Sequence, residues 1–231
     1  MRRLLPALAG LALAGLALAG CATGGVNYPA GGPGGSDLDV DAAWLAGGSM
    51  IVVVTYGSSS CAPLLDGAVV DGGALVVSLK ENPDTAKGCT DDLAPQPLLV
   101  GTPAGVDPAK ELEIQVTLGD SLGDADFDGY TGGAVEEYTP SAAWVDDGLL
   151  AILTWGSSSC APVVQSATAE TPDSVAVTFV TPAADQVCTM DMAPRVVVTS
   201  VDGEVSDDAT LSLGPLGAAP GGPGGGAIPI H

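Results

Sequence analysis

The sequence predicts an all-β protein made of two tandem units, each a small antiparallel β-sandwich closed by one internal disulfide. Short runs of Val, Leu and Ile lie between turn signals, and no long apolar stripe of helical period is present. The heptapeptide Gly-Ser-Ser-Ser-Cys-Ala-Pro occurs twice. Cys61 and Cys89 are 28 positions apart, and so are Cys160 and Cys188. These observations indicate a duplicated, disulfide-linked β unit.

Residues 1–20 are typical of a lipoprotein signal peptide, with two arginines before an uncharged apolar run of 17 residues. That run is marginal for crossing a membrane as a helix. Leu18-Ala19-Gly20-Cys21 resembles the lipobox of bacterial lipoproteins, in which the cysteine thiol takes a diacylglycerol and becomes the new N-terminus. Cys21 is therefore the predicted lipidation site. The protein is expected on the extracytoplasmic face of the cell membrane, and a secreted protein or an uncleaved anchor are the alternatives.

Two segments rich in Gly and Pro flank the predicted β units. Residues 21–36 are uncharged and are expected to be a flexible tether. Residues 215–231 have a similar composition and are expected to be a disordered tail.

The charge balance is strongly acidic. After residue 20 the chain has 28 acidic and four basic side chains, so its net charge is 4 − 28 = −24. Such a surface repels nucleic acid and anionic lipid headgroups, so the lipid rather than the protein surface is expected to hold the membrane. A surface that keeps the protein soluble explains this charge, and cation binding or docking to a basic partner is the functional alternative.

The two units are predicted at residues 37–119 and 142–214. Ala42-Ala43-Trp44 recurs as Ala142-Ala143-Trp144, and the segment that begins at each second cysteine recurs as well. Four cysteines allow three pairings, and the repeat favours Cys61–Cys89 and Cys160–Cys188. Each bond would close a loop of about 29 residues and stabilise its unit by about 3–4 kcal/mol. The repeated tryptophans are expected in the core, with sugar stacking as the alternative.

The strands are expected where apolar runs stop at turn signals. Residues 50–56 and 149–155 are continuous apolar runs, as in strands covered on both faces. Asp71-Gly72-Gly73 indicates a hairpin turn, and residues 170–173 are the equivalent turn in the second unit. Residues 112–118 alternate between apolar and polar side chains, which predicts a half-buried strand. Residues 98–100 and 196–199 are predicted as strands after the second cysteines.

The alignment of the two units has one conflict of phase. A constant offset between the paired cysteines aligns Val175 with Val76, whereas the alternation of apolar residues aligns it with Leu75. Because a shift of one residue reverses the buried face of a strand, we expect two compensating indels that make Leu75 equivalent to Val175. The last strand of the alignment matches Leu211 to Val116.

The serine loops are candidates for ligand contact because each places three hydroxyls at the end of a strand. The alternative is that the hydroxyls stabilise a tight turn, as Asp92 and Asp191 also would. Nucleophilic catalysis is not favoured, because the motif lacks the second glycine of a nucleophile elbow and the only histidine, His231, lies in the predicted tail. The candidate hydroxyls belong to Ser58, Ser59, Ser60, Ser157, Ser158 and Ser159.

Residues 120–141 are predicted to be an acidic linker between the units. Within them Asp124, Asp126 and Asp128, followed by Gly129, match the opening of a calcium-binding loop. The twelfth position should be Glu but is Val135, and Glu136 comes one residue late. A solvated linker and a Ca²⁺ site with these three aspartates and Glu136 as ligands therefore both remain open.

The repeated motifs resemble those of lipid-anchored or secreted proteins of high-GC Gram-positive bacteria that have no assigned function. The resemblance rests on Thr-[Tyr/Trp]-Gly-Ser-Ser-Ser-Cys-Ala-Pro and Cys-Thr-x-Asp-[Leu/Met]-Ala-Pro, in residues 42–95 and 142–194. It implies a location at the outer face of the cytoplasmic membrane, beneath or within the cell wall, and supplies no catalytic residue. We therefore predict a non-enzymatic binding or structural module whose partner is a cell-wall polymer or a protein. A calcium-dependent scaffold is the alternative, and a wall-acting enzyme is less favoured.

Overall fold

The computed structural model describes residues 37–83, 88–214 and 226–231. The predicted signal peptide, Cys21, the tether and residues 215–225 lie outside this range. The described part consists of β-strands, connecting loops and one 3-10 turn (Ala46–Gly48). No helix in it is long and apolar enough to cross a membrane.

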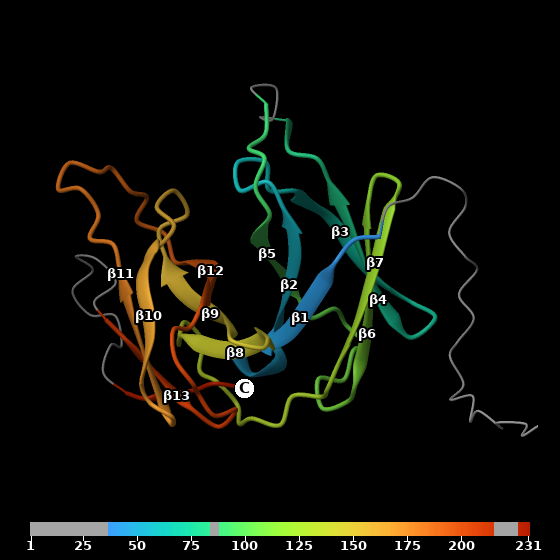
Figure 1. Cartoon of the computed structure of the whole chain (residues 1–231). Coiled ribbons are helices and arrows are strands. Elements are labelled where there is room, and N and C mark those ends of the chain that lie inside the picture. Colours follow the sequence, from blue (N-terminus) through green and yellow to red (C-terminus); the bar gives the residue numbers. More distant parts are fainter. Residues whose placement is uncertain (1–36, 84–87, 215–225) are drawn as a thin grey trace, which may run out of the picture. The chain divides into compact units, whose positions relative to one another are not determined.

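The first unit is a pair of sheets (Figure 1). One sheet has the strand order β1-β2-β5 and the other the order β3-β4-β6-β7. A buried cluster that includes Trp44, Ile51, Leu75 and Ile114 lies between them. The strands are β1 (Val40–Leu45), β2 (Met50–Gly57), β3 (Leu64–Asp71), β4 (Ala74–Lys80), β5 (Ala94–Gly101), β6 (Leu112–Leu118) and β7 (Ser121–Phe127).

The second unit repeats this architecture. Its sheets have the orders β12-β9-β8 and β10-β11-β13-β14, so β8 to β14 correspond to β1 to β7. The predicted all-β fold with two units is confirmed. The pairs β4–β6 and β11–β13 are parallel, so one sheet of each unit is mixed. The strands are β8 (Ser141–Asp146), β9 (Leu149–Gly156), β10 (Val164–Thr171), β11 (Ser174–Phe179), β12 (Ala193–Ser200), β13 (Thr210–Leu213) and β14 (Ile228–Pro229).

Strands β2 and β9 are covered on both faces, as their continuous apolar runs predict. In β2, Ile51 and Val53 belong to the core of the first unit. Val52 and Val54 point the other way, into a cluster shared with the second unit. Successive side chains of a strand face opposite sides, so a strand between two apolar layers needs no polar positions.

The shared cluster joins the two three-stranded sheets. It is formed by residues of β1 and β2 in the first unit and of β8 and β9 in the second, among them Leu45 and Leu153. At its margin the Ala46 amide donates a hydrogen bond of 2.9 Å to Ser141 Oγ. The two units are therefore packed against each other through an apolar interface.

The expected indels are present. Leu75 and Val175 follow equivalent hairpin turns and are both fully buried, which confirms their equivalence. In β10 the pairing skips Glu170 between Ala169 and Thr171, whereas β3 has no bulge at this point. The extra residue of the second unit is thus Glu170, in a β-bulge.

The alignment of the last strands was wrong by two residues. Leu211 pairs with Val175 in the way that Ile114 pairs with Leu75, so Leu211 is equivalent to Ile114 and not to Val116. The loops before these strands differ in length, and the short second copy offered too few residues to fix the register.

Two boundaries also differ from the prediction. The expected linker contains β7, which pairs with β6 over its whole length. A Cβ on Gly123 of this strand would overlap with the carbonyl oxygen of Leu38, so glycine permits the close approach of the neighbouring backbone. The exposed acidic residues of this strand led to its prediction as a linker. Its inward-facing residue Phe127 packs on Trp44, with ring centroids 5.1 Å apart.

The end of the chain is ordered, contrary to the predicted disordered tail. β14 pairs with β13, and Ile230 is buried in the core of the second unit. The His231 carbonyl accepts a hydrogen bond of 2.8 Å from the Trp144 amide. The His231 ring packs edge-on against Tyr130, with centroids 4.9 Å apart, so this histidine is fixed in place.

Candidate functional site

Both predicted disulfides are present. Cys61 and Cys89 are joined with Cα atoms 5.5 Å apart, and Cys160 and Cys188 with Cα atoms 5.6 Å apart. Each bond ties the end of the central strand, β2 or β9, to the segment that leads into β5 or β12. Each serine loop is thereby held against the loop that carries the second cysteine.

The hydroxyls of the first serine loop are bonded within this pair of loops. Ser58 Oγ lies 2.7 Å from Thr90 Oγ1, and the Thr90 amide donates to Ser60 Oγ at 2.9 Å. The Ser59 amide donates to Asp92 Oδ1 at 3.1 Å, and the Thr90 hydroxyl donates to the same oxygen. The hydroxyls thus stabilise the turn, which favours the structural alternative.

The second loop repeats the arrangement with its own residues. Ser157 Oγ lies 2.8 Å from Thr189 Oγ1, and the Thr189 amide donates to Ser159 Oγ at 3.0 Å. The Ser158 amide donates to Asp191 Oδ1 at 2.8 Å. The same network in both units is what duplication of a structural element produces.

The network lowers the pKa of each aspartate. Hydrogen bonds from the Ser59 side chain, then from Thr90 and from the Ser59 amide, lower the pKa of Asp92 to about 2. The equivalent bonds from Ser158 and Thr189 lower the pKa of Asp191. Each bond favours the charged form of the carboxyl group.

We predict that the first serine loop keeps its structure down to about pH 2. A carboxylate with a lowered pKa stabilises the folded form above its ordinary pKa of about 3.9 and stops doing so as the pH falls through its folded pKa. The chemical shift of the Ser59 amide proton should therefore titrate with a midpoint near pH 2. The Asp92→Asn variant should show no such titration, and a midpoint near pH 4 in the native protein would contradict the network.

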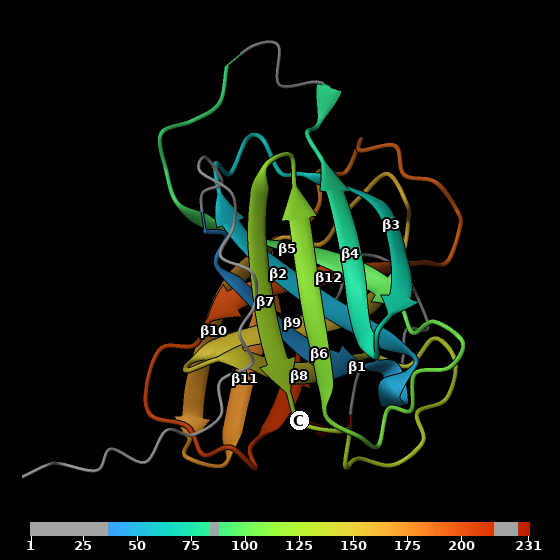
Figure 2. The same ribbon diagram turned by 90° about the vertical axis from the view of Figure 1, so that its right-hand side faces the viewer.

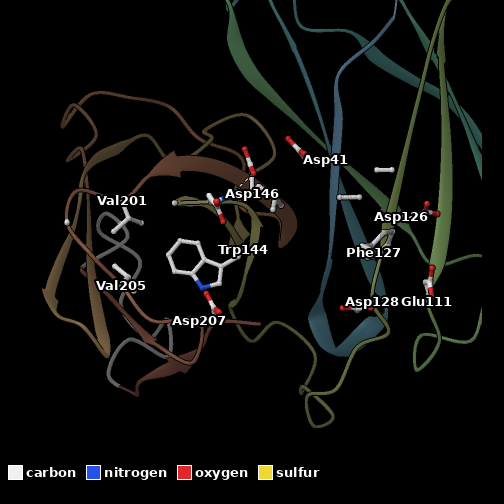
Figure 3. A pocket seen from close by; sticks show the side chains of 16 residues that line it. Asp41, Glu111, Asp126, Phe127, Asp128, Trp144, Asp146, Val201, Val205 and Asp207 are labelled. Carbon is white, nitrogen blue, oxygen red and sulfur yellow. Dashed lines mark hydrogen bonds between the residues drawn. The ribbon is translucent and has the colours of Figure 1, made fainter. Parts of the chain in front are cut away.

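A cavity of about 690 Å³ lies where the two units meet (Figure 3). The first unit contributes residues of β1 and β7 and the residue before β6, and the second contributes the end of β8, the β8–β9 turn and the loop after β12. None of the lining residues is basic. The carboxylates in its wall belong to Asp41, Glu111, Asp126, Asp128, Asp146, Asp147 and Asp207.

Some of these carboxylates repel one another, and the repulsion contributes to a raised pKa of Asp41. Burial raises the pKa of Asp41, a 2.5 Å hydrogen bond from Tyr56 Oη lowers it, and repulsion from Asp146 and Asp39 raises it further. Like charges in a partly enclosed space disfavour the ionised form, and a bound cation would relieve this repulsion.

Aromatic rings form another part of the wall, namely Phe127 and Trp144. Trp144 Nε1 is buried and has no hydrogen-bond partner among the described residues. In the first unit the equivalent Trp44 Nε1 donates to Asp128 O at 2.9 Å. In the view of Figure 3 the Trp144 indole nitrogen points toward Asp207.

The calcium prediction falls partly on this cavity. Asp124 and Asp126 lie on the exposed face of β7 and not in a loop. Asp126 also lines the cavity, as does Asp128, whereas Asp124 does not. Glu136 is in the segment before β8 and is not part of the wall. Within the described ranges, no three His, Cys, Asp or Glu side chains are grouped so as to hold a metal ion.

Sequence reasoning missed most of the cavity because its residues come from distant segments. A usable signal was present: acidic residues flank the repeated Ala-Ala-Trp motif, as Asp41 in the first unit and as Asp146 and Asp147 in the second. Comparison of the chain with protein-family models, with curated proteins and with solved structures gives no match.

Proposed function

We propose that this protein is a lipid-anchored, non-enzymatic binding module on the extracytoplasmic face of the cell membrane, and that the cavity between its units takes cationic side chains of a basic partner. The lipobox-like Leu18-Ala19-Gly20-Cys21 supports the location. The observation that carries the binding function is the cavity wall, which holds seven carboxylates and no basic residue.

The wall suits an organic cation. Carboxylates attract an ammonium or guanidinium group, and the aromatic rings of Phe127 and Trp144 in the wall would add attraction where a cation meets their π-electrons. The interaction of two unit charges 4 Å apart near a protein surface is about 4 kcal/mol before desolvation, so several carboxylates give a useful affinity. A cavity of about 690 Å³ also has room for a side chain of Lys or Arg with part of its backbone.

A calcium-dependent scaffold is the second candidate, because Asp126 and Asp128 of the predicted calcium motif both line this cavity. Calcium would be held by oxygen ligands alone. The two candidates share the site and differ in the ligand.

We predict that a trilysine amide binds to the purified full-length protein and that the double variant Asp126→Asn/Asp146→Asn binds it at least about tenfold more weakly, as expected for the loss of about 1.4 kcal/mol. Isothermal titration calorimetry in 20 mM and 500 mM NaCl measures this, and salt should weaken binding because it screens the charges.

The matched control is Glu81→Gln/Asp185→Asn, which removes two exposed carboxylates outside the cavity wall. This control should bind trilysine as the native protein does. Equal losses in both double variants would refute the cavity as the site. Saturable binding of CaCl₂ without binding of trilysine would establish the second candidate in place of the first.

A further inference from the structure

Strand β3 is the last strand of its sheet and has an open edge (Figure 2). It pairs with β4 on one side. On the other side no backbone hydrogen bond joins it to any part of the chain that the structure describes. Unpaired N–H and C=O groups along an edge can pair with another strand.

The second unit shows how such an edge is covered. The equivalent strand, β10, is paired along its outer side with the loop after β12. The Ala169 amide donates to Asp202 O at 2.9 Å, and the Asp202 amide donates to Ala167 O at 3.0 Å. This forms a parallel bridge between Thr168 and Asp202. The loop lies so close that a Cβ on Gly203 would be 3.0 Å from Ala169 Cβ.

The first unit lacks this cover for a chemical reason. Equivalent residues of the two serine loops, and of β5 and β12, differ by 99 in residue number. Pro103, which follows β5, is therefore the equivalent of Asp202, which follows β12. Proline has no N–H group and cannot make the bond that Asp202 donates. The atoms left open in β3 are the equivalents of those used in β10, namely Ala68 O and Val70 N.

The side chains at this edge are apolar and accessible. Val70 and Leu65 lie opposite the buried Leu75 and Leu79, yet they are 42% and 38% exposed. Val69, on the outer face, is 60% exposed. Its equivalent in the second unit is the polar Thr168. The first unit thus presents apolar surface where the second unit has covered its edge.

We propose that β3 binds an extended, basic segment of a partner protein by strand addition, parallel to β3 and through Ala68 O and Val70 N. The proposal concerns a different surface from the cavity and does not depend on it. Main-chain hydrogen bonds would provide affinity, and the exposed Val69 on the outer face of the sheet would favour apolar residues at alternate positions of the partner, which lie on that same face.

The excess of negative charge on this chain favours a basic partner over a second copy of the chain. Of the 28 acidic residues only Asp84 is outside the described part, so 27 acidic and three basic residues (Lys80, Lys110 and Arg195) remain there. A second copy would bring the same excess of acidic residues to the shared edge, including the exposed Asp71 at the end of β3, and the two copies would repel each other. Lysines or arginines that flank an apolar segment of a partner would instead be attracted to this edge.

The probe is a fluorescent peptide, Lys-Val-Thr-Val-Thr-Val-Lys, titrated into the full-length protein and followed by fluorescence anisotropy. Val70→Pro removes the open N–H, and Val69→Lys adds a charge to the exposed face. Both should weaken binding at least about tenfold. Thr168→Lys, the same charge change at the covered edge of the second unit, should leave binding unchanged. Circular dichroism checks that each variant is folded. If the Val70→Pro variant is not folded, the result with Val69→Lys decides the test.

Three results would overturn the proposal. They are no saturable binding of the peptide, equal weakening by Thr168→Lys, and equal binding of a peptide with glutamate in place of both lysines. Sedimentation velocity of the protein alone adds a fourth outcome: a dimer that Val69→Lys dissociates would make a second copy, and not a basic partner, the occupant of this edge.

Discussion

Replacing Leu153 with alanine is expected to lower the free energy of unfolding by about 2–5 kcal/mol. Leu153 is fully buried in the cluster between the two three-stranded sheets. The shorter side chain would lose its burial and leave a cavity that the rigid strands on both sides cannot fill. Chemical denaturation followed by circular dichroism measures the change.

The control for this prediction is Leu93→Ala, because Leu93 is 76% exposed and its replacement should change stability by no more than about 0.5 kcal/mol. If the interface between the units contributes to folding, the native protein should unfold in one transition. Two separate transitions, with a small effect of Leu153→Ala on both, would show that the units fold independently.

Removing the second disulfide with Cys160→Ala/Cys188→Ala is expected to cost about 3–4 kcal/mol in the chain-entropy model, because the sequence separation of 28 residues makes a sizeable loop in the unfolded chain. Thermal and urea unfolding of the variant measure the loss. The same replacement at Cys61 and Cys89, which have the same separation, should cost a similar amount. A loss below about 1 kcal/mol in both would mean that the hydrogen-bonded serine loops hold their shape without the bonds.

The features that could be predicted from the sequence are those that repeat or that depend on neighbouring residues. The central strands were evident from unbroken apolar runs, and the disulfides from equal spacings. The equivalence of Leu75 and Val175 followed from alternation alone, because burial imposes a period of two on a strand. These signals need no knowledge of distant parts of the chain.

The features that sequence reasoning missed depend on long-range contacts. The acids of β7 resemble those of a solvated linker until β6 is placed beside them. β14 has only two residues, and its pairing with β13 could not be anticipated from a segment rich in Gly and Pro. The cavity combines Asp41 with Asp207, which are brought together only by the packing of the two units. Its acidic character was nevertheless consistent with the cation-binding alternative that the net charge raised.

The most direct test of the central claim, that the cavity between the units binds organic cations, is the indole N–H resonance of Trp144 during a titration with trilysine amide. Trp44 Nε1 donates to Asp128 O and Trp155 Nε1 donates to Thr139 O, whereas Trp144, a residue of the cavity wall, has a buried Nε1 with no partner among the described residues. We predict that the Trp144 resonance shifts with saturation, that the Trp155 resonance does not move, and that Asp126→Asn/Asp146→Asn reduces the shift. An unmoved Trp144 resonance at a concentration that saturates binding would contradict the claim.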